Sequence, residues 1–384
     1  MTAASTATQA PTVTRTASPA PQPESPGEAV ETFFDPNAPA ADQDALPVAP
    51  AGDTGPSGPT IPEQNTVIVS YAGQVVPILT VPDGINTGPA IAEGDIFAVN
   101  DSGQIAAVDR GGELRIDAST VTVSPASEFG LHPNLNYGDL AWSPNGHYLA
   151  FRVDADDPQD FNGIDTGIWI YETATNRSWQ VFRNTYAGQV TQQHEQRRAL
   201  SVTWAPNNTA LAITVATPVG QRIVFLPVKH NVNEWVDSLP HADATWTTDS
   251  TGLIVSGTTE NGQAAVGRVN LDAFWTYTKY LDQATTGLTM QAATQLNDRR
   301  IAFLGADAGS FALYATAAIS NSQPTRLSQP ITGQIIAAEW NSERTAVLIT
   351  TQTDNQQLLW IIRIDGTVRN TTPNDAALSD AHWR

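Results

Sequence analysis

A run of acidic and amide residues, DADDPQDFNGID at 154–165, is the densest set of side chains that could do chemistry in this sequence. Hard cations such as Ca²⁺ bind clustered carboxylate and carbonyl oxygens, so the run is a weak calcium candidate. It lacks the Asp-x-Asp-x-Asn-Gly core of an EF-hand loop, and an acidic loop in contact with water explains the same composition. We predict no metal site; the ligands of the weak calcium candidate would be Asp154, Asp156, Asp160, Asn162 and Asp165.

A second motif, HEQRR at 194–198, lies in the long connection NTYAGQVTQQHEQRRAL. Zinc metalloproteases of the HExxH type need two His residues four positions apart on a helix, and Arg198 stands where the second His would be. This departure excludes the metalloprotease hypothesis. His194, Arg197 and Arg198 then form a basic loop, which we expect to open on the same face as the acidic loop and to balance its charge.

Other catalytic signatures are absent from the sequence. It contains no Gly-x-Ser-x-Gly elbow, no P-loop, no dinucleotide fingerprint and no cysteine. The 31 acidic residues of 66–384 leave room for one alternative, a glycan- or small-molecule-processing enzyme that uses paired carboxylates in the propeller channel. We therefore predict a non-catalytic protein without a cofactor, and keep that enzyme as the alternative.

The elements that position these loops form an internal repeat. Its clearest copy is DLAWSPNGHYLAFRV at 139–153, in which Trp142 precedes a turn and Phe151 follows nine positions later. The same offset of nine recurs three more times. The pairs are Trp204 and Ile213, Trp246 and Val255, and Trp340 and Ile349.

Two degenerate copies fit the same frame, with Ala90 and Thr294 at the anchor position, and Trp383 supplies a final anchor. The seven anchors are separated by 42 to 62 residues. Short strands that recur at about this period are the signature of propeller blades. We expect the anchors Trp142, Trp204, Trp246, Trp340 and Trp383 to pack between blades rather than to contact a ligand.

Each repeat contains four segments of strand character. In the clearest copy, the segments HYLAFRV, GIWIYET and SWQVFRN follow the first strand and the turn at Asn145-Gly146. The segment GIWIYET is apolar on both faces, as expected for a strand that is covered by a neighbouring sheet on each side. The pattern predicts four-stranded antiparallel blades.

The segments WSPNGHYLAF and GIWIYETATNRSWQVF resemble the blade signature of TolB-like β-propellers, which are relatives of the WD-repeat proteins. The match is best over 139–183, and the resemblance covers most of 66–384. It implies an all-β propeller. It implies little about function, because such propellers serve as adaptors, as periplasmic assembly factors and as non-catalytic domains of peptidases.

A propeller must close its ring, because open sheet edges promote aggregation. We predict seven blades, with six as the alternative, within a domain at 66–384 whose last blade is shared between 65–81 and 377–384. The shared blade then has three evident strands, Trp383 is buried, and its strand pairs near Val67–Ser70. In the other arrangement the natural chain continues the repeat beyond Arg384.

Residues 1–65 differ in composition from the rest. They hold twelve of the 26 Pro and few aliphatic residues, so we predict a disordered Pro/Ala/Thr-rich linker or tether. The formal charge of −20 disfavours nucleic-acid partners, which need a basic surface. No apolar run is long enough to span a bilayer, and the N-terminus shows no signal peptide.

The two Lys against 17 Arg, together with many Asn, Gln, Thr and Ser, are typical of an exported bacterial protein. We therefore expect an extracytoplasmic binding or scaffold propeller, which recognises a protein or a cell-envelope polymer on its long-loop face. Trp235 lies outside the repeat frame in a connecting segment, which makes it a better contact candidate than the anchors. The predicted partner-binding residues are Asp156, Asp160, His194, Arg197, Arg198 and Trp235.

Overall fold

Short β-strands make up almost all of the regular structure in the computed structural model, and they form seven separate antiparallel sheets. One helical turn, α1 (Gln283–Thr286), is capped by the carboxylate of Asp282, which accepts a hydrogen bond from the Thr285 N–H at 2.8 Å. The structure describes residues 65–81, 84–117, 119–121, 135–155, 166–186, 196–228, 236–239, 243–258, 262–271, 276–353, 356–373 and 378–384.

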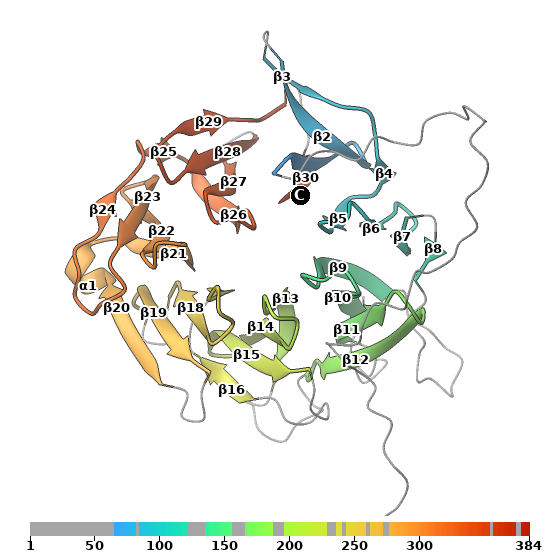
Figure 1. The fold of residues 1–384 in the computed structure, drawn as a ribbon, viewed down its shortest axis with the longest axis horizontal. Helices are drawn as coiled ribbons and strands as arrows, with labels where there is room; N and C mark the ends of the chain where they lie inside the picture. Colours follow the sequence, from blue (N-terminus) through green and yellow to red (C-terminus); the bar gives the residue numbers. More distant parts are fainter. Residues whose placement is uncertain are drawn as a thin grey trace, which may run out of the picture. The chain divides into compact units, whose positions relative to one another are not determined.

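The seven sheets are arranged around a central axis as the blades of a propeller (Figure 1). The first strand of each blade is innermost and the later strands follow outward, except in the blade that joins both ends of the described chain. The predicted all-β fold with seven four-stranded blades is confirmed, and the six-bladed alternative is excluded.

Blades one to four are continuous in sequence. Blade one contains β5 (Ile96–Val99), β6 (Ile105–Val108), β7 (Leu114–Ile116) and β8 (Ser119–Thr120). Blade two contains β9 (Leu135–Trp142), β10 (Tyr148–Ala155), β11 (Gly167–Glu172) and β12 (Arg177–Arg183). Blade three contains β13 (Arg198–Trp204), β14 (Ala210–Thr217), β15 (Gly220–Pro227) and β16 (Val236–Leu239). Blade four contains β17 (Asp243–Trp246), β18 (Gly252–Ser256), β19 (Ala265–Asn270) and β20 (Tyr277–Asp282).

Blades five and six repeat the pattern, and blade seven closes the ring. Blade five contains β21 (Thr289–Gln295), β22 (Ile301–Asp307), β23 (Ser310–Thr316), β24 (Thr325–Arg326) and β25 (Ile331–Thr332). Blade six contains β26 (Gln334–Trp340), β27 (Ala346–Gln352), β28 (Gln357–Arg363) and β29 (Val368–Asn370). Blade seven contains β30 (Leu378–Trp383), β1 (Val67–Tyr71), β2 (Gln74–Val81), β3 (Gly84–Thr87) and β4 (Ala92–Glu93).

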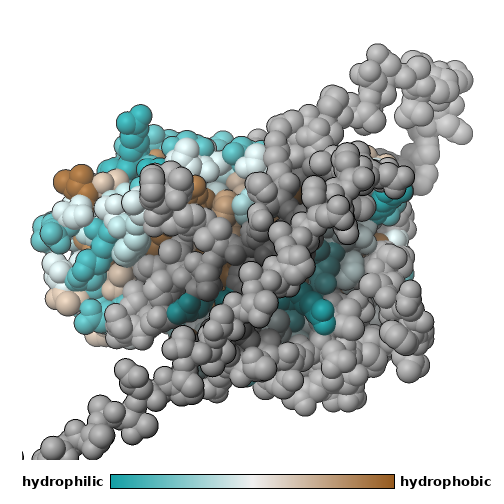
Figure 2. All heavy atoms as spheres, turned by 90° about the horizontal axis from the view of Figure 1, so that it is seen from below, coloured by the Kyte–Doolittle hydropathy of each residue, from teal (hydrophilic) through white to brown (hydrophobic). Residues whose placement is uncertain are grey.

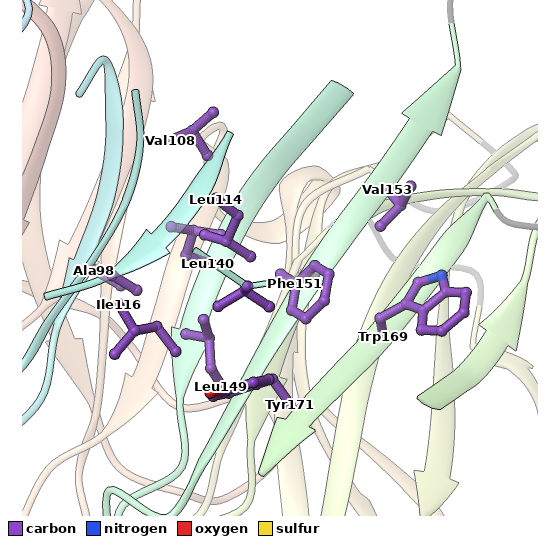
Figure 3. Close-up of a cluster of buried hydrophobic side chains, with 12 residues drawn as sticks. Ala98, Val108, Leu114, Ile116, Leu140, Leu149, Phe151, Val153, Trp169 and Tyr171 are labelled. Atoms are coloured by element: carbon purple, nitrogen blue, oxygen red, sulfur yellow. The ribbon is translucent and has the colours of Figure 1, made fainter. Parts of the chain in front are cut away.

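The hydrophobic core lies between the blades rather than in one central layer. Five of the six residues of β11 are buried, because neighbouring sheets cover both of its faces. One cluster joins blades one and two and includes the fully buried Leu114, Leu149 and Phe151 (Figure 3). Each blade is therefore stabilised mainly by its two neighbours.

The five Trp anchors share one contact. The indole N–H of each donates to a main-chain carbonyl in the inner strand of the preceding blade, at distances from 2.8 to 3.3 Å. The donor and acceptor pairs are Trp142 and Ala98, Trp204 and Ala141, Trp246 and Thr203, Trp340 and Ala292, and Trp383 and Glu339. One repeated hydrogen bond thus ties successive blades together.

The two degenerate anchors are corrected by the structure. Ala90 precedes the inner strand of blade one, and Val99 takes the anchor position there. In blade five the anchor position is Gln295 rather than Thr294, because the N–H of Leu296 begins the following turn. Both turns are one residue shorter than the turn after Trp142, so the offset of nine misplaces the anchor of blade five by one residue. In blade one the frame is displaced by a whole offset, because Val99, expected nine positions after the anchor, is itself the anchor.

Blade seven joins segments from both ends of the described chain. Strand β30 pairs antiparallel with β1, with Val67 opposite Trp383, and the sheet has five strands where three were expected. Next to this pair, the N–H of Arg384 donates to the carbonyl of Thr66 at 3.0 Å. Trp383 is half-buried rather than buried, because one side of it borders the central cavity.

The two ends of the blades carry different connections. The turn rim is the end with the turns at 100–104, 143–147, 205–209, 247–251, 296–300 and 341–345, which come after the inner strands of blades one to six. The loop rim is the opposite end, where β9 begins and β10 ends. Neighbouring turns of the turn rim are linked by hydrogen bonds of 3.1 Å between Asn145 and Asn208, between Asn207 and Ser250, and between Asn297 and Glu343.

Candidate functional site: the central channel

A cavity of about 740 Å³ runs between the inner strands of all seven blades, and is called the channel here. Many of its lining residues are small, including Ala98, Ala141 and Ala244, because closely spaced inner strands leave little room for side chains. The ionisable side chains in its lining are Asp139, Asp243, Glu339, Arg344, Asp380 and His382. None of them is among the site residues predicted from the loops.

Three of these carboxylates occupy one position of the repeat, three residues before a Trp anchor, in the segments DLAW, DATW and DAHW. Each accepts a hydrogen bond from a main-chain N–H of the next blade. The pairs are Asp139 with Val202, Asp243 with Ala292 (2.9 Å) and Asp380 with Phe97 (3.5 Å). The recurring Asp-x-x-Trp is the sequence signal that could have identified this set.

Asp139 is the most perturbed of the three carboxylates. Burial raises the pKa of Asp139 to about 6, while the Val202 N–H and the nearby Arg152 and His382 lower it and Asp380 raises it further. Its backbone is left-handed, with φ of 48°, in the irregular stretch where β9 loses register with β10. The residue before it is Gly138, and a Cβ there would lie 2.8 Å from the Arg152 guanidinium.

Asp243 has the same place in blade four. Burial raises its pKa, and hydrogen bonds from the Ala292 N–H and from the Ser256 hydroxyl, at 3.3 Å, oppose the shift. The same Ser256 hydroxyl accepts from the Ala293 N–H at 3.1 Å. Asp243 thus lies at the centre of a group of hydrogen bonds that link blades four and five.

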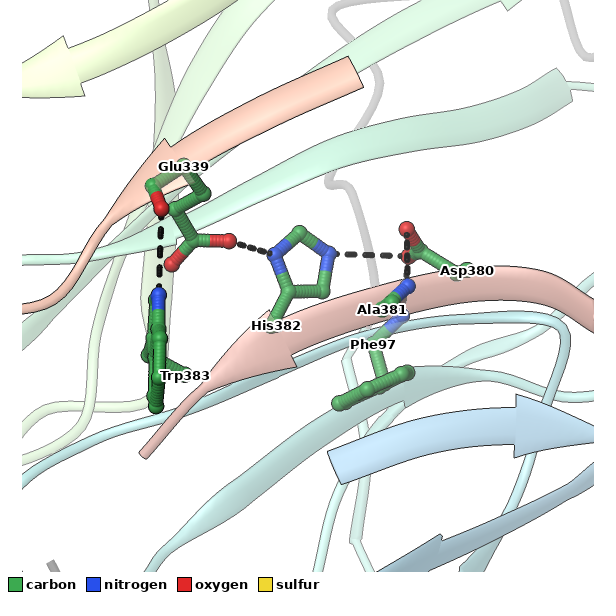
Figure 4. Close-up of polar contacts among 6 residues, drawn as sticks. All are labelled: Phe97, Glu339, Asp380, Ala381, His382 and Trp383. Atoms are coloured by element: carbon green, nitrogen blue, oxygen red, sulfur yellow. Dashed lines mark hydrogen bonds and ion pairs between the residues drawn. The ribbon is translucent and has the colours of Figure 1, made fainter. Parts of the chain in front are cut away.

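Asp380 belongs to a chain of three charged groups (Figure 4). The Nδ1 of His382 lies 2.7 Å from Glu339 Oε2, and its Nε2 lies 2.9 Å from Asp380 Oδ2. Burial alone would lower the pKa of His382, but attraction to and hydrogen bonding with Glu339 and Asp380 raise it well above 6.5. Because both ring nitrogens face carboxylates, we assign His382 as an imidazolium that donates to both.

Arg344 lies at the turn-rim end of the channel. Its guanidinium donates to the carbonyls of Trp246 and Gln295, each at 2.8 Å, and so joins blades four, five and six. Burial lowers its pKa, and Asp249 opposes that shift. Within the described lining, four carboxylates therefore face two cations, and each of the six groups already bonds to a protein partner.

The structure describes only some of the residues predicted from the loops. Asp156, Asp160, His194 and Trp235 lie outside the described residues, as do Asn162 and Asp165 of the calcium candidate. Asp154 is the next-to-last residue of β10 and forms an ion pair with Arg152 at 2.9 Å. Across the described ranges, no group of three or more His, Cys, Asp or Glu is placed to hold a metal ion.

Arg197 and Arg198 lie together at the loop rim. The main chain of Arg197 pairs with Thr185, and Arg198 begins β13 with an exposed side chain.

A second cavity, of about 430 Å³, lies between blades seven and one and is called the seam groove. Ile91, Ala92, Ile105 and Ala107 form its apolar lining, with charged residues around them. Among these, Arg115 forms ion pairs with Asp109 at 2.8 Å and with Glu113 at 2.9 Å.

Large apolar side chains are exposed singly rather than as a patch. Among the described residues these are Leu79, Val219, Tyr277, Ile319 and Ile336, which belong to blades seven, three, four, five and six. In Figure 2, hydrophobic residues visible on the left of the surface are interspersed with hydrophilic ones. Such scattered residues are ordinary for a protein surface. None of the helices described in this structure has the length and apolar character needed to cross a membrane.

Comparison with known proteins found similarity to solved structures only. No family model and no curated protein matches the sequence. A solved structure of TolB from Acinetobacter baumannii is 14% identical, with 84% of this chain and 68% of that chain covered and a TM-score of 0.47. The periplasmic gluconolactonase PpgL of Pseudomonas aeruginosa is 12% identical, with 83% and 98% covered and a TM-score of 0.50.

Dipeptidyl peptidase 4 of Porphyromonas gingivalis is 11% identical, with 79% of this chain covered, a TM-score of 0.47 and about half of the peptidase spanned (51%). Identities this low concern the fold alone. The seven sheets of the structure describe the chain as an all-β, seven-bladed propeller, in agreement with the TolB-like or WD-repeat-type fold expected from the sequence.

Proposed function

We propose that this chain is a non-catalytic binding or scaffold propeller, extracytoplasmic and tethered by its N-terminal segment, which recognises a protein or a cell-envelope polymer at the loop rim. One observation supports this proposal above the others. The carboxylates of the channel already accept hydrogen bonds or an ion pair from groups of neighbouring blades. A catalytic acid or base must exchange its proton with substrate, whereas these groups hold the ring together.

The geometry of His382 also supports a non-catalytic role. A histidine acts as a general base through a free ring nitrogen that faces the reacting hydroxyl or water. Here Glu339 and Asp380 occupy both nitrogens, at 2.7 and 2.9 Å. The ring therefore bridges two carboxylates in the channel wall rather than facing a substrate.

The loop rim is the better place for a partner because the longer connections leave from it. Residues 156–165 separate β10 from β11 and residues 184–197 separate β12 from β13, whereas 143–147 form the five-residue turn after β9. Loops presented by a rigid scaffold commonly carry binding residues. Arg198 is exposed at this rim, beside Arg197.

A pair of double variants tests the proposed face. Arg197→Ala/Arg198→Ala removes two arginines at the loop rim, and Arg299→Ala/Arg300→Ala removes two exposed arginines at the turn rim. We expect cross-linking to a partner from an envelope extract to fall about tenfold in the first variant only, as for the loss of about 1.4 kcal/mol of binding free energy. Equal recovery with both variants would refute the loop-rim proposal.

The alternative enzyme retains one supporting observation. Burial raises the pKa of Asp139 to about 6, close to the range in which general acids work, and its side chain lines a cavity of about 740 Å³. A screen of lactone and glycoside hydrolysis from pH 5 to 8 with wild type and Asp139→Asn decides the matter. Turnover that the variant loses would establish the enzyme and displace the binding proposal.

A further inference from the structure

Strand β30 closes the ring of blades, and noncovalent contacts hold it on both sides. This closure, between β30 and its neighbours in blades six, seven and one, is called the join here. Strand β30 pairs with β1, which lies at the other end of the described sequence. Toward blade six, the Trp383 indole donates to the Glu339 carbonyl at 3.0 Å. Toward blade one, the Phe97 N–H reaches Asp380 at 3.5 Å, the longest of the blade-to-blade contacts made by the Asp-x-x-Trp carboxylates.

His382 stands in the middle of this join. Its ring bridges Glu339 of β26 and Asp380 of β30, and it meets the Phe97 ring of β5 edge-on, with centroids 5.1 Å apart. One residue thus contacts blades six, seven and one. Its side chain is 31% exposed, so channel water can exchange its protons.

We propose that His382 is a proton-operated latch, which as an imidazolium holds β30 against blade six and on losing a proton loosens this join. The physical reason is the number of N–H donors on the imidazole ring. An imidazolium has two N–H groups, one for each carboxylate, whereas neutral imidazole has one. After deprotonation, either Glu339 or Asp380 faces a nitrogen lone pair, and two carboxylates lie around an uncharged ring.

The charged groups around the latch favour the protonated state, and they outweigh the burial that lowers the pKa of His382. Glu339 comes from β26, Asp380 from β30 itself, and Asp139 from β9 on the far side of blade one. Strand β5 contributes the Phe97 ring, and β1 places Ile68 opposite His382. Arg152 is the cation that acts on Asp139. Among the described contacts of His382 there are carboxylates and an aromatic ring, and no cation.

The direction of the pH effect follows from linkage. The pKa of His382 in the folded protein lies well above 6.5, so its contribution to closure is complete below pH 6.5. The contribution is lost as the pH rises through the folded-state value. We therefore expect the join to loosen selectively as the solution becomes alkaline.

Hydrogen exchange of the full chain tests the latch. Peptides that cover β1 and β30 are followed from pH 6 to 9.5, corrected for intrinsic rates and compared with β22 and β23 of blade five. In wild type, exchange at the join should rise relative to blade five with pH. In His382→Gln it should already be about tenfold faster at pH 6.5 and lose this pH dependence, as for one charged hydrogen bond removed.

Two further variants serve as controls. His382→Lys keeps a cation, so its join should stay closed to higher pH than that of His382→Gln. His147→Gln removes the histidine in the turn after Trp142 and should leave exchange at the join unchanged. Equal protection of the join in wild type and His382→Gln at pH 6.5 would overturn the proposal.

A spectroscopic titration keeps the test independent of whether His382→Gln folds. In wild type, the NMR signals of the His382 ring should be those of an imidazolium at pH 7, and Glu339→Gln should move its titration to lower pH. A neutral His382 ring at pH 7 in wild type, or an unchanged titration in a folded Glu339→Gln protein, would overturn the latch.

Discussion

Blades one and five both lack the Trp anchor, yet they differ in packing. Blade five has Gln295 at that position, and the fully buried Phe303 stacks on Tyr314 with ring centroids 5.7 Å apart. Blade one has Val99, strands of at most four residues, and the seam groove of about 430 Å³ beside it. What a blade needs is filled volume between sheets, and a Trp is one of several ways to provide it.

The largest expected effect tests this comparison directly. Phe303→Ala should lower the free energy of unfolding by about 3–5 kcal/mol, because the surrounding blade is densely packed and cannot collapse into the space. Phe97→Ala, in blade one, should cost about 2–3 kcal/mol, since the seam groove lets neighbours relax. Urea denaturation of both variants provides the values. An equal or larger loss in Phe97→Ala would break the comparison.

The charge of Asp139, at the border of blade one, should have a smaller effect on the free energy of unfolding, and this effect should depend on pH. Strand β5 carries no charged residue, and Asp380, on one side of it, raises the pKa of Asp139 on the other. Burial raises that pKa from 3.8 to about 6, so the folded state binds the proton more tightly, and the cost in stability grows as the pH rises from 3.8 and is complete above about pH 6.

Asp139→Asn should therefore increase the free energy of unfolding by about 1–3 kcal/mol at pH 8, and the gain should fall to about a third of that value at pH 4.5. Urea midpoints at the two pH values measure it. Asp307→Asn, at an exposed turn of blade five, is the control. A gain that is the same at both pH values would contradict the assignment of the effect to the buried charge.

The smallest expected change in stability comes from filling the seam groove beside blade one. Ala107 is buried, lines the seam groove and belongs to a cluster of only four buried residues. Ala107→Val should raise stability by up to about 1 kcal/mol. The matched variant Ala302→Val, in the dense core of blade five, should lose about 1–3 kcal/mol through overpacking. Thermal melts of both variants suffice, and loss of stability in both would mean that the groove has no usable space.

The blades could be predicted from the sequence because one aromatic position repeats with its turn. Four copies around Trp142, Trp204, Trp246 and Trp340 gave the period, and Trp383 extended it to the last inner strand. The frame failed by one residue at Thr294, where the turn is shorter by one residue, and by nine at Ala90, where Val99 is itself the anchor. A pattern of side chains does not register a change in turn length when the aromatic marker is missing.

The charged residues of the channel were not predicted from the sequence, although their repeated positions before the anchors can be seen in it. Asp139, Asp243 and Asp380 all precede an anchor by three positions, and Glu339 and His382 both directly precede one. Residues at one repeat position in adjacent blades lie side by side, so His382 meets Glu339 across 43 positions of sequence. The half-burial of Trp383 could not be read in this way, because it depends on the width of the channel.

The backbone contacts at the join have a consequence for chain connectivity. The Arg384 N–H bonds to the Thr66 carbonyl, as the Ser143 N–H bonds to the Tyr148 carbonyl in the turn of blade two. The join therefore copies a hairpin turn without its covalent link. A circularly permuted chain, with 384 linked to 65 by a short loop and new termini opened between Asn145 and Gly146, has every blade in the same spatial order. The propeller architecture therefore does not require any particular blade to come first in the sequence.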